Sequence, residues 1–118
     1  MNVPAAATLH SPIKISAEHP SFAGHFPEFP VLPGAVLLDE ALQVIQRQRN
    51  VDLTRWQIAS AKFLDAVRPG DALRLEHDAP KSGLIRFSIL APDRAVPGKD
   101  RTVLSGSLSS AAQSGGAA

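Results

Sequence analysis

The sequence predicts an α+β domain in which an antiparallel sheet of five to six strands wraps one long helix. Three observations favour this class. A single apolar segment, 34–49, lacks the alternation of a strand, short alternating segments follow it, and turn sequences separate them. The length of 118 residues suits one domain. We assign that domain to residues 1–110 and expect the low-complexity segment 111–118 to be a disordered tail.

The expected first strand alternates the apolar residues Leu9, Ile13 and Ile15 with polar neighbours. Pro12 within it indicates a position near a sheet edge, because proline cannot donate to a strand ladder. The following segment 17–33 is punctuated by prolines and rich in phenylalanine. It therefore predicts an ordered loop that is neither helix nor regular strand.

A helix is expected over 34–49, directly after Pro33. Proline suits a first helical turn, and Arg47 and Arg49 suit the negative end of the helix dipole. Apolar residues cover most of the circumference, which is typical of a buried helix. They are Val36, Leu37, Leu38, Ala41, Leu42, Val44 and Ile45.

Everything after the helix is expected to be strand and turn. Alternating residues predict strands within 56–67, 73–78, 85–89 and 102–109, with turns at 68–71 and 81–83 and a longer loop at 92–100. His10 and His77 fall in strand patterns and are poor catalytic candidates.

Composition excludes several classes of function. Twelve Lys and Arg against eleven Asp and Glu give a net charge of +1 without a basic stripe, so nucleic acid is not an expected partner. The absence of cysteine excludes disulfides and thiolate metal sites. No apolar run approaches the ~20 residues of a membrane helix, and the first residues do not resemble a signal peptide. We expect a cytoplasmic protein with no membrane span.

The loop before the helix holds the first candidate for chemistry. His25 lies in a stretch without charge, where a neutral imidazole suits a general base near pH 7. The alternative is a loop histidine that binds a backbone carbonyl. His10, His19 and His25 have no recognisable ligand spacing, so no metal site is expected.

The helix supplies three further candidates. Asp39 and Glu40 interrupt its apolar pattern, and a buried carboxylate could donate a proton. One of the two could instead face solvent, and the pattern weakly favours Asp39 as the more enclosed and functional one. The N–H of Gly34 could bind a polarised carbonyl, or the glycine could simply permit a tight turn.

Residues 23–43, AGHFPEFPVLPGAVLLDEALQ, resemble the active-site segment of FabA/FabZ-type 3-hydroxyacyl-carrier-protein dehydratases. That family has a G-H-F-P motif, a P-G pair at the helix start, an acid fourteen positions after the histidine and a glutamine four later. Here these are residues 24–27, Pro33 with Gly34, Asp39 and Gln43. Residues 61–76 resemble the family's strand–PGD–strand hairpin, and the resemblance covers about residues 9 to 110.

The resemblance implies a hot-dog fold and a dimer, with His25 of one chain facing Asp39 of the other. It implies reversible loss of water from a 3-hydroxyacyl thioester, giving a trans-2-enoyl thioester. His25 would take the α-proton and Asp39 would protonate the departing hydroxyl. The Gly34 N–H would polarise the carbonyl and Gln43 would orient Asp39.

Phe26 and Pro33 are expected to support this site. No cofactor is implied, since the substrate is carried on the phosphopantetheine of an acyl carrier protein or on CoA. The chain resembles short dehydratases of aryl-polyene or related pigment clusters, some of which act with a partner subunit. A homodimer or a heterodimer with a related hot-dog subunit therefore remains open.

Two other functions remain open, a hot-dog acyl thioesterase and a non-catalytic partner subunit of a dehydratase heterodimer. An acidic carrier protein would dock on basic residues. The candidates are Arg47, Arg49, Arg68, Arg94, Lys99 and Arg101.

Overall fold

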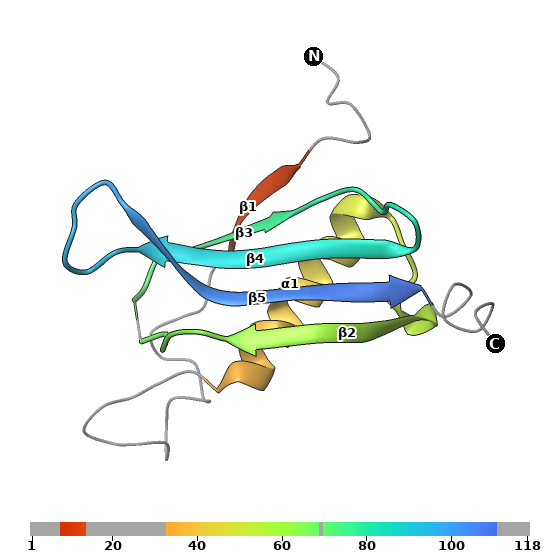
Figure 1. The fold of residues 1–118 in the computed structure, drawn as a ribbon, viewed down its shortest axis with the longest axis horizontal. Helices are drawn as coiled ribbons and strands as arrows, with labels where there is room; N and C mark the ends of the chain where they lie inside the picture. The colour runs from red at the N-terminus through yellow and green to blue at the C-terminus, as the bar shows by residue number, and fades with distance from the viewer. Residues whose placement is uncertain (1–7, 14–32, 69, 111–118) are drawn as a thin grey trace.

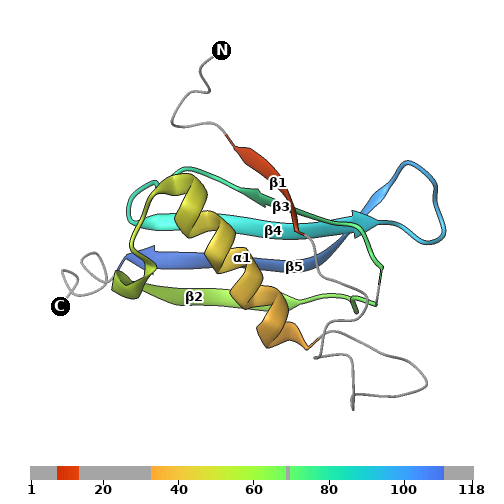
Figure 2. The same cartoon turned by 180° about the vertical axis from the view of Figure 1, so that it is seen from behind.

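The computed structural model describes residues 8–13, 33–68 and 70–110. In these ranges five strands form one antiparallel sheet in the order β1–β3–β4–β5–β2, and one helix crosses a single face of it (Figure 1, Figure 2). The elements are β1 (Leu9–Ile13), α1 (Gly34–Arg49), the 3-10 turn η2 (Leu53–Arg55), β2 (Trp56–Phe63), β3 (Leu73–His77), β4 (Leu84–Pro92) and β5 (Asp100–Ser110). The α+β class is confirmed.

Helix α1 begins and ends at the residues that the sequence indicated. Pro33 precedes it with extended backbone (φ −58°, ψ 139°), and its carbonyl accepts hydrogen bonds from the N–H groups of Val36 and Leu37 at 3.1 and 3.3 Å. Asn50 adopts the left-handed conformation (φ 53°, ψ 47°) and ends the helix. Asparagine tolerates this conformation better than most residues, which makes it a suitable helix terminator.

One face of α1 packs on the sheet, through the buried residues Leu37, Ala41, Val44 and Ile45. The opposite face is exposed in the single chain, at Ala35, Asp39, Gln43 and Gln46. The expectation of a helix buried all round is therefore wrong for one chain. The apolar pattern is broader than the stripe that a single sheet can cover.

The sheet presents alternate residues to the helix, which explains its alternating sequence. In β3 and β4 buried residues, among them Leu75, Ile85 and Ile89, alternate with half-buried or exposed ones. β5 departs from this pattern where its register with β4 shifts, because Val103 and Leu104 are both fully buried there. β1 pairs only with β3 among the described strands, so Pro12 lies at an edge as predicted. Such one-sided burial is usual for antiparallel sheets.

Local sequence explains the two hairpin connections of β4. Lys81 and Leu84 bond to each other through both backbone groups, around Ser82 (φ 53°) and Gly83 (φ 76°), the pattern of a tight hairpin turn. Beyond Pro92 the β4–β5 loop projects from the sheet (Figure 1). There the carboxylate of Asp93 accepts bonds from the N–H groups of Ala95 and Val96, which hold its pKa below the ordinary value.

The strand expected within 56–67 is confirmed as β2, which covers the first eight residues of that segment. β2 ends at Phe63, and the N–H of Leu64 still bonds to the carbonyl of Val103 at 2.8 Å. The chain then turns away, and its polar groups bind side chains from the base of the β4–β5 loop. Positions 14 and 15 of the expected first strand, and the expected tail, lie outside the described residues.

His77 joins the last turn of α1 to β3. Its ring is 1% exposed, its Nδ1 accepts a hydrogen bond from Arg49 Nε at 3.0 Å, and its Nε2 lies 2.8 Å from Gln48 Oε1. Because Nδ1 accepts, the ring proton sits on Nε2 and is donated to Gln48. Burial, and then the charge of Arg49, lower the pKa of His77 to about 4. The ring is a neutral structural link.

This link predicts a loss of stability in mild acid. The unfolded chain takes up a proton on His77 near pH 6.5, while the folded chain resists until about pH 4, so stability falls as the pH drops through this window. The loss reaches about 3 kcal/mol, at 1.36 kcal/mol per pKa unit. Urea unfolding at pH 7 and pH 4.5 measures it.

The control is His77→Gln, which keeps a polar side chain but cannot titrate. Asp78 and His10, the other titratable groups near the ring, are present in both proteins. The difference between the two pH dependences therefore isolates His77. An equal loss of stability in wild type and variant would contradict the prediction.

Candidate active site

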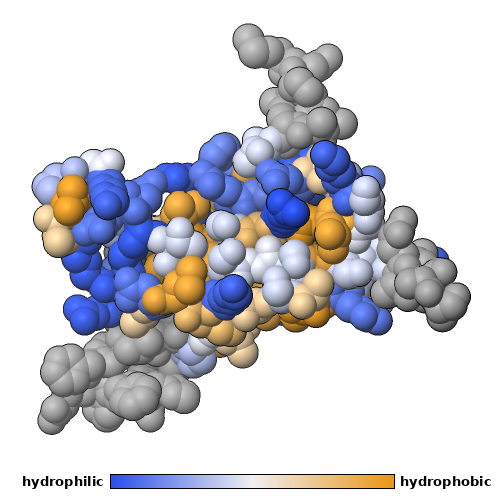
Figure 3. All heavy atoms as spheres, viewed as in Figure 1, coloured by the Kyte–Doolittle hydropathy of each residue, from blue (hydrophilic) through white to orange (hydrophobic). Residues whose placement is uncertain are grey.

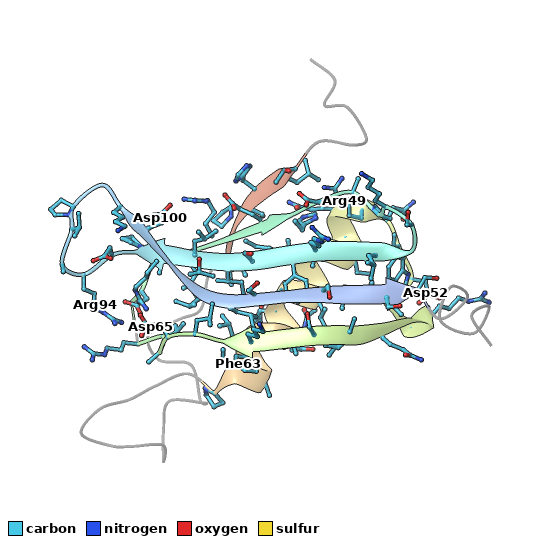
Figure 4. The ribbon with its side chains drawn as sticks, in the orientation of Figure 1. Arg49, Asp52, Phe63, Asp65, Arg94 and Asp100 are labelled. Atoms are coloured by element: carbon cyan, nitrogen blue, oxygen red, sulfur yellow. The ribbon has the colours of Figure 1, made fainter. Side chains whose placement is uncertain are left out.

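A depression of about 530 Å³ opens where α1 begins. Its helical side is formed by Gly34, Ala35 and Leu37, and the segment 63–67 forms the facing wall. Figure 4 shows Phe63, at the end of β2, beside the first turn of the helix. The sequence places this wall here because β2 runs antiparallel to β5 and delivers its last residue to the start of α1.

Gly34 and Phe63 are in close contact across the depression. A Cβ atom built on Gly34 would lie 2.6 Å from Cε1 of Phe63, so only glycine fits beneath the ring in its present position. The first N–H groups of a helix lack intrahelical acceptors and carry the positive end of the dipole. The floor of the depression can therefore stabilise a carbonyl oxygen that gains negative charge.

Asp39 and Gln43 form a pair on the outer face of α1. Gln43 Nε2 donates a hydrogen bond to Asp39 Oδ2 at 2.7 Å, as side chains four residues apart on a helix can do. Asp39 is exposed and Glu40 is half-buried. The expectation that Asp39 lies on the more enclosed side is therefore wrong for the single chain.

Helical geometry separates Asp39 from the depression of its own chain. At about 100° per residue, Asp39 lies roughly 180° from the centre of the buried stripe, whereas Gly34 lies only about 35° from it. Gly34 faces the sheet and Phe63, and Asp39 faces away. In one chain, the expected carbonyl-binding residue Gly34 and the expected acid Asp39 thus lie on opposite sides of the helix.

Among the other expected site residues, Pro33 is half-buried and caps the helix through its carbonyl. His25 and Phe26 lie outside the described residues. The structure thus brings Pro33 next to Gly34 and Asp39 next to Gln43, but not the first pair next to the second.

Sequence reasoning did not single out the wall at 63–67 as part of a site. Phe63 and Leu64 are apolar yet 53% and 57% exposed in the single chain, and both line the depression. No signal in the sequence marked Phe63 as part of a site, because its place in the alternating pattern gave it a core position.

Neither a metal cluster nor a membrane-spanning helix occurs in the described ranges. No group of three His, Cys, Asp or Glu side chains there is arranged to hold a metal ion. No helix there has the length and apolar character needed to cross a bilayer.

Comparisons with known proteins agree on one family and one fold. The family model "ApeI-like: ApeI dehydratase" matches residues 3–100. The chain is 40% identical, over 70 residues, to a 3-hydroxyacyl-[acyl-carrier-protein] dehydratase FabZ of Chlamydia caviae, a match covering 52% of this chain and 46% of that protein. The chain thus spans about half the length of this curated relative.

Solved structures with low sequence identity share the fold. The dehydratase heterocomplex ApeI:P from Xenorhabdus doucetiae matches with a TM-score of 0.67 and 24% identity, over 92% of this chain and 90% of that one. The dehydratase domain of the polyketide PpsC from Mycobacterium tuberculosis matches with a TM-score of 0.72 and 17% identity, over 93% of this chain and 41% of that one. The architecture is the hot-dog fold. Since the family model covers most of its length, the chain belongs to the ApeI-like dehydratase family.

Proposed function

We propose that the chain removes water from 3-hydroxyacyl thioesters carried by an acyl carrier protein or CoA, giving trans-2-enoyl thioesters. Family membership supports this proposal. The observation that carries it is the pairing of Asp39 with Gln43 on a helix whose N-terminus opens into a depression. Aryl-polyene synthesis is the proposed setting, and no cofactor is required by the chemistry.

The reaction is an elimination that needs a base, an acid and a stabilised enolate. His25 takes the proton on the carbon next to the thioester carbonyl, and the electron pair moves toward the carbonyl oxygen. The N–H of Gly34, at the positive helix end, stabilises that oxygen. When the double bond forms, the C–O bond at carbon 3 breaks, and Asp39 supplies the proton that lets the hydroxyl leave as water.

The Gln43 contact suits Asp39 to act as the acid. Because Gln43 donates to Oδ2, that oxygen serves as an acceptor, and the proton of the carboxylic acid belongs on Oδ1. The amide also fixes the plane of the carboxyl group. Gln43 is thus a positioning residue, and Oδ1 is the atom turned toward a substrate.

A second hot-dog chain is proposed to complete the site, because Asp39 faces away from its own depression. β2 is a sheet edge, paired only with β5 among the described strands, and Ile58 on it is 49% exposed. Apolar surface follows the border where β2 lies (Figure 3). Long unpaired edges invite pairing with another strand, so this edge fits a second sheet.

The same partner would cover the outer face of α1 and remove Asp39 from water. The partner is either a second copy of this chain or a related subunit, and the similarity to one chain of the ApeI:P heterocomplex supports both forms.

The acyl carrier protein is proposed to dock beside the depression. The described contacts favour one of the basic candidates for this surface over others. Arg49 and Arg101 are held by His77 and by an ion-pair cluster, and Arg47 lies in the last turn of α1, away from the depression. Arg68 is exposed on the chain that continues from the wall, which makes it the best-placed contact for an acidic carrier.

The first test of the function uses hydration of a trans-2-enoyl thioester and the reverse dehydration. We expect His25→Ala and Asp39→Asn each to lower kcat by about a hundredfold or more, because each removes a proton-transfer group. The matched control is Glu40→Gln, next to Asp39 on the helix, which should lose less than about threefold. Activity that survives both site substitutions, or release of free thiol instead of hydration, would overturn the assignment.

A second expectation concerns the floor of the depression. In Gly34→Ala the new Cβ meets the Phe63 ring, which is 53% exposed and free to swing aside, so we expect a melting temperature within a few degrees of wild type. The displaced ring fills the depression, and kcat/KM should fall by about tenfold or more.

Gly106→Ala is the contrasting variant. Its Cβ would lie 2.6 Å from the backbone carbonyl oxygen of Ser60, which cannot move without shifting β2, so we expect a loss of about 1–3 kcal/mol in stability. Thermal unfolding and turnover, measured on both variants, separate the two effects. A Gly34→Ala protein with full activity would contradict a role for this floor.

The proposed edge pairing predicts the size of the particle in solution. Sedimentation should give about twice the chain mass of 12.5 kDa, and Ile58→Lys should shift the population toward the single chain. Val96→Lys is the matched control, because Val96 is 47% exposed but lies on the β4–β5 loop. A wild-type monomer would exclude the homodimer and leave the related subunit as the partner to be tested by co-expression.

A further inference from the structure

We propose that Arg101 is a positioning residue that holds the wall of the depression against the start of α1. Arg101 lies at the base of the β4–β5 loop, and its side chain is only 11% exposed. Its guanidinium reaches across to the segment that lines the depression. This inference rests on the proposed function, because it assigns to Arg101 the shape of that same site.

The guanidinium bonds to three separate parts of the chain. Its Nε donates to the carbonyl of Pro92 at 3.2 Å, at the end of β4. Its Nη1 donates to the carbonyl of Ala66 at 3.1 Å and lies 2.9 Å from Asp65 Oδ2. Asp65 and Ala66 both line the depression. Arg101 thus ties the wall to the rigid end of a central strand.

The third contact of the guanidinium is with Asp71, which follows the wall in the chain. Arg101 Nη2 lies 3.1 Å from Asp71 Oδ2, which also accepts from the Arg68 N–H at 2.8 Å and from Arg94 Nη2 at 2.9 Å. One carboxylate oxygen therefore closes the 68–71 turn and joins it to Arg101. Figure 4 shows Asp65 and Arg94 at the same end of the molecule as Phe63.

Few other described contacts fix the wall. Val67 is buried in the core, and the N–H of Leu64 bonds to the carbonyl of Val103. Between these two points, the Asp65 side chain and the Ala66 carbonyl are held by Arg101. A guanidinium presents five N–H donors on three separate nitrogens in one rigid plane, so it spans acceptors that are too far apart for the single nitrogen of a lysine. Low exposure also weakens screening of these contacts by water.

The wall faces Gly34, where the thioester carbonyl is proposed to bind, so a displaced wall changes substrate binding more than proton transfer. Arg101 is not among the residues that line the depression, and it touches neither Gly34 nor Asp39 in any described contact. Its removal should therefore raise KM and leave kcat nearly unchanged. A protein that was merely destabilised would show the opposite, with fewer active molecules, a lower apparent kcat and an unchanged KM.

The experiment compares Arg101→Gln with wild type in the full-length protein, using a CoA-bound enoyl substrate to avoid carrier docking. We expect KM to rise about tenfold, with kcat within about twofold. Amide hydrogen exchange should become at least about tenfold faster in 64–71 and stay unchanged in β3. Asp65→Ala removes one exposed partner of Arg101. It should raise KM and the exchange rate of 64–71 in the same direction, but by a smaller factor.

Arg74→Gln is the matched control. Arg74 also pairs with two carboxylates, Asp100 at 2.8 Å and Glu76 at 3.4 Å, but it makes no described contact with the wall. Unchanged KM and exchange in both Arg101→Gln and Asp65→Ala would overturn the inference. If the wild-type protein turns over no thioester, the proposed function fails, and exchange in 64–71 alone decides whether Arg101 holds the wall.

Discussion

The packing of one apolar stripe of α1 against the sheet determines the arrangement of the rest of the molecule. Leu37, Ala41, Val44 and Ile45 fix the rotation of the helix about its own axis. Once that rotation is set, Gly34 must face β2 and Asp39 must face away from the sheet. The division of the expected chemistry between two sides of one helix is therefore a direct result of core packing.

Strong local signals made the helix and several of the strands predictable. Pro33 and Gly34 marked the helix start, and alternation in 73–77 and 84–89 marked strands that are buried on one side. The rotation of the helix was not predictable, because apolar residues surround it and no single face stands out. This is why Asp39 was expected on the enclosed side, whereas the helix turns it outward.

The candidate site was predictable only where its residues are close in sequence. The Asp39–Gln43 pair follows from a spacing of four on a helix, and the structure has it. The cluster of Asp65, Asp71, Arg94 and Arg101 has no such signal, since its members come from four places in the chain and meet only after the sheet forms. The same holds for His77 and Arg49, 28 residues apart. Patterns of period two or 3.6 carry no information about such pairings.

The contact between Gly34 and Phe63 makes substitutions at two distant positions depend on each other. The ring occupies the space that any side chain at position 34 would need, at 2.6 Å from the missing Cβ. A descendant of this chain that gained a side chain at 34 would push the ring into the depression, and would keep the depression open only if the residue at 63 also became smaller. A larger residue at 34 is therefore compatible with an open depression only after a change at 63, so the order of the two changes matters.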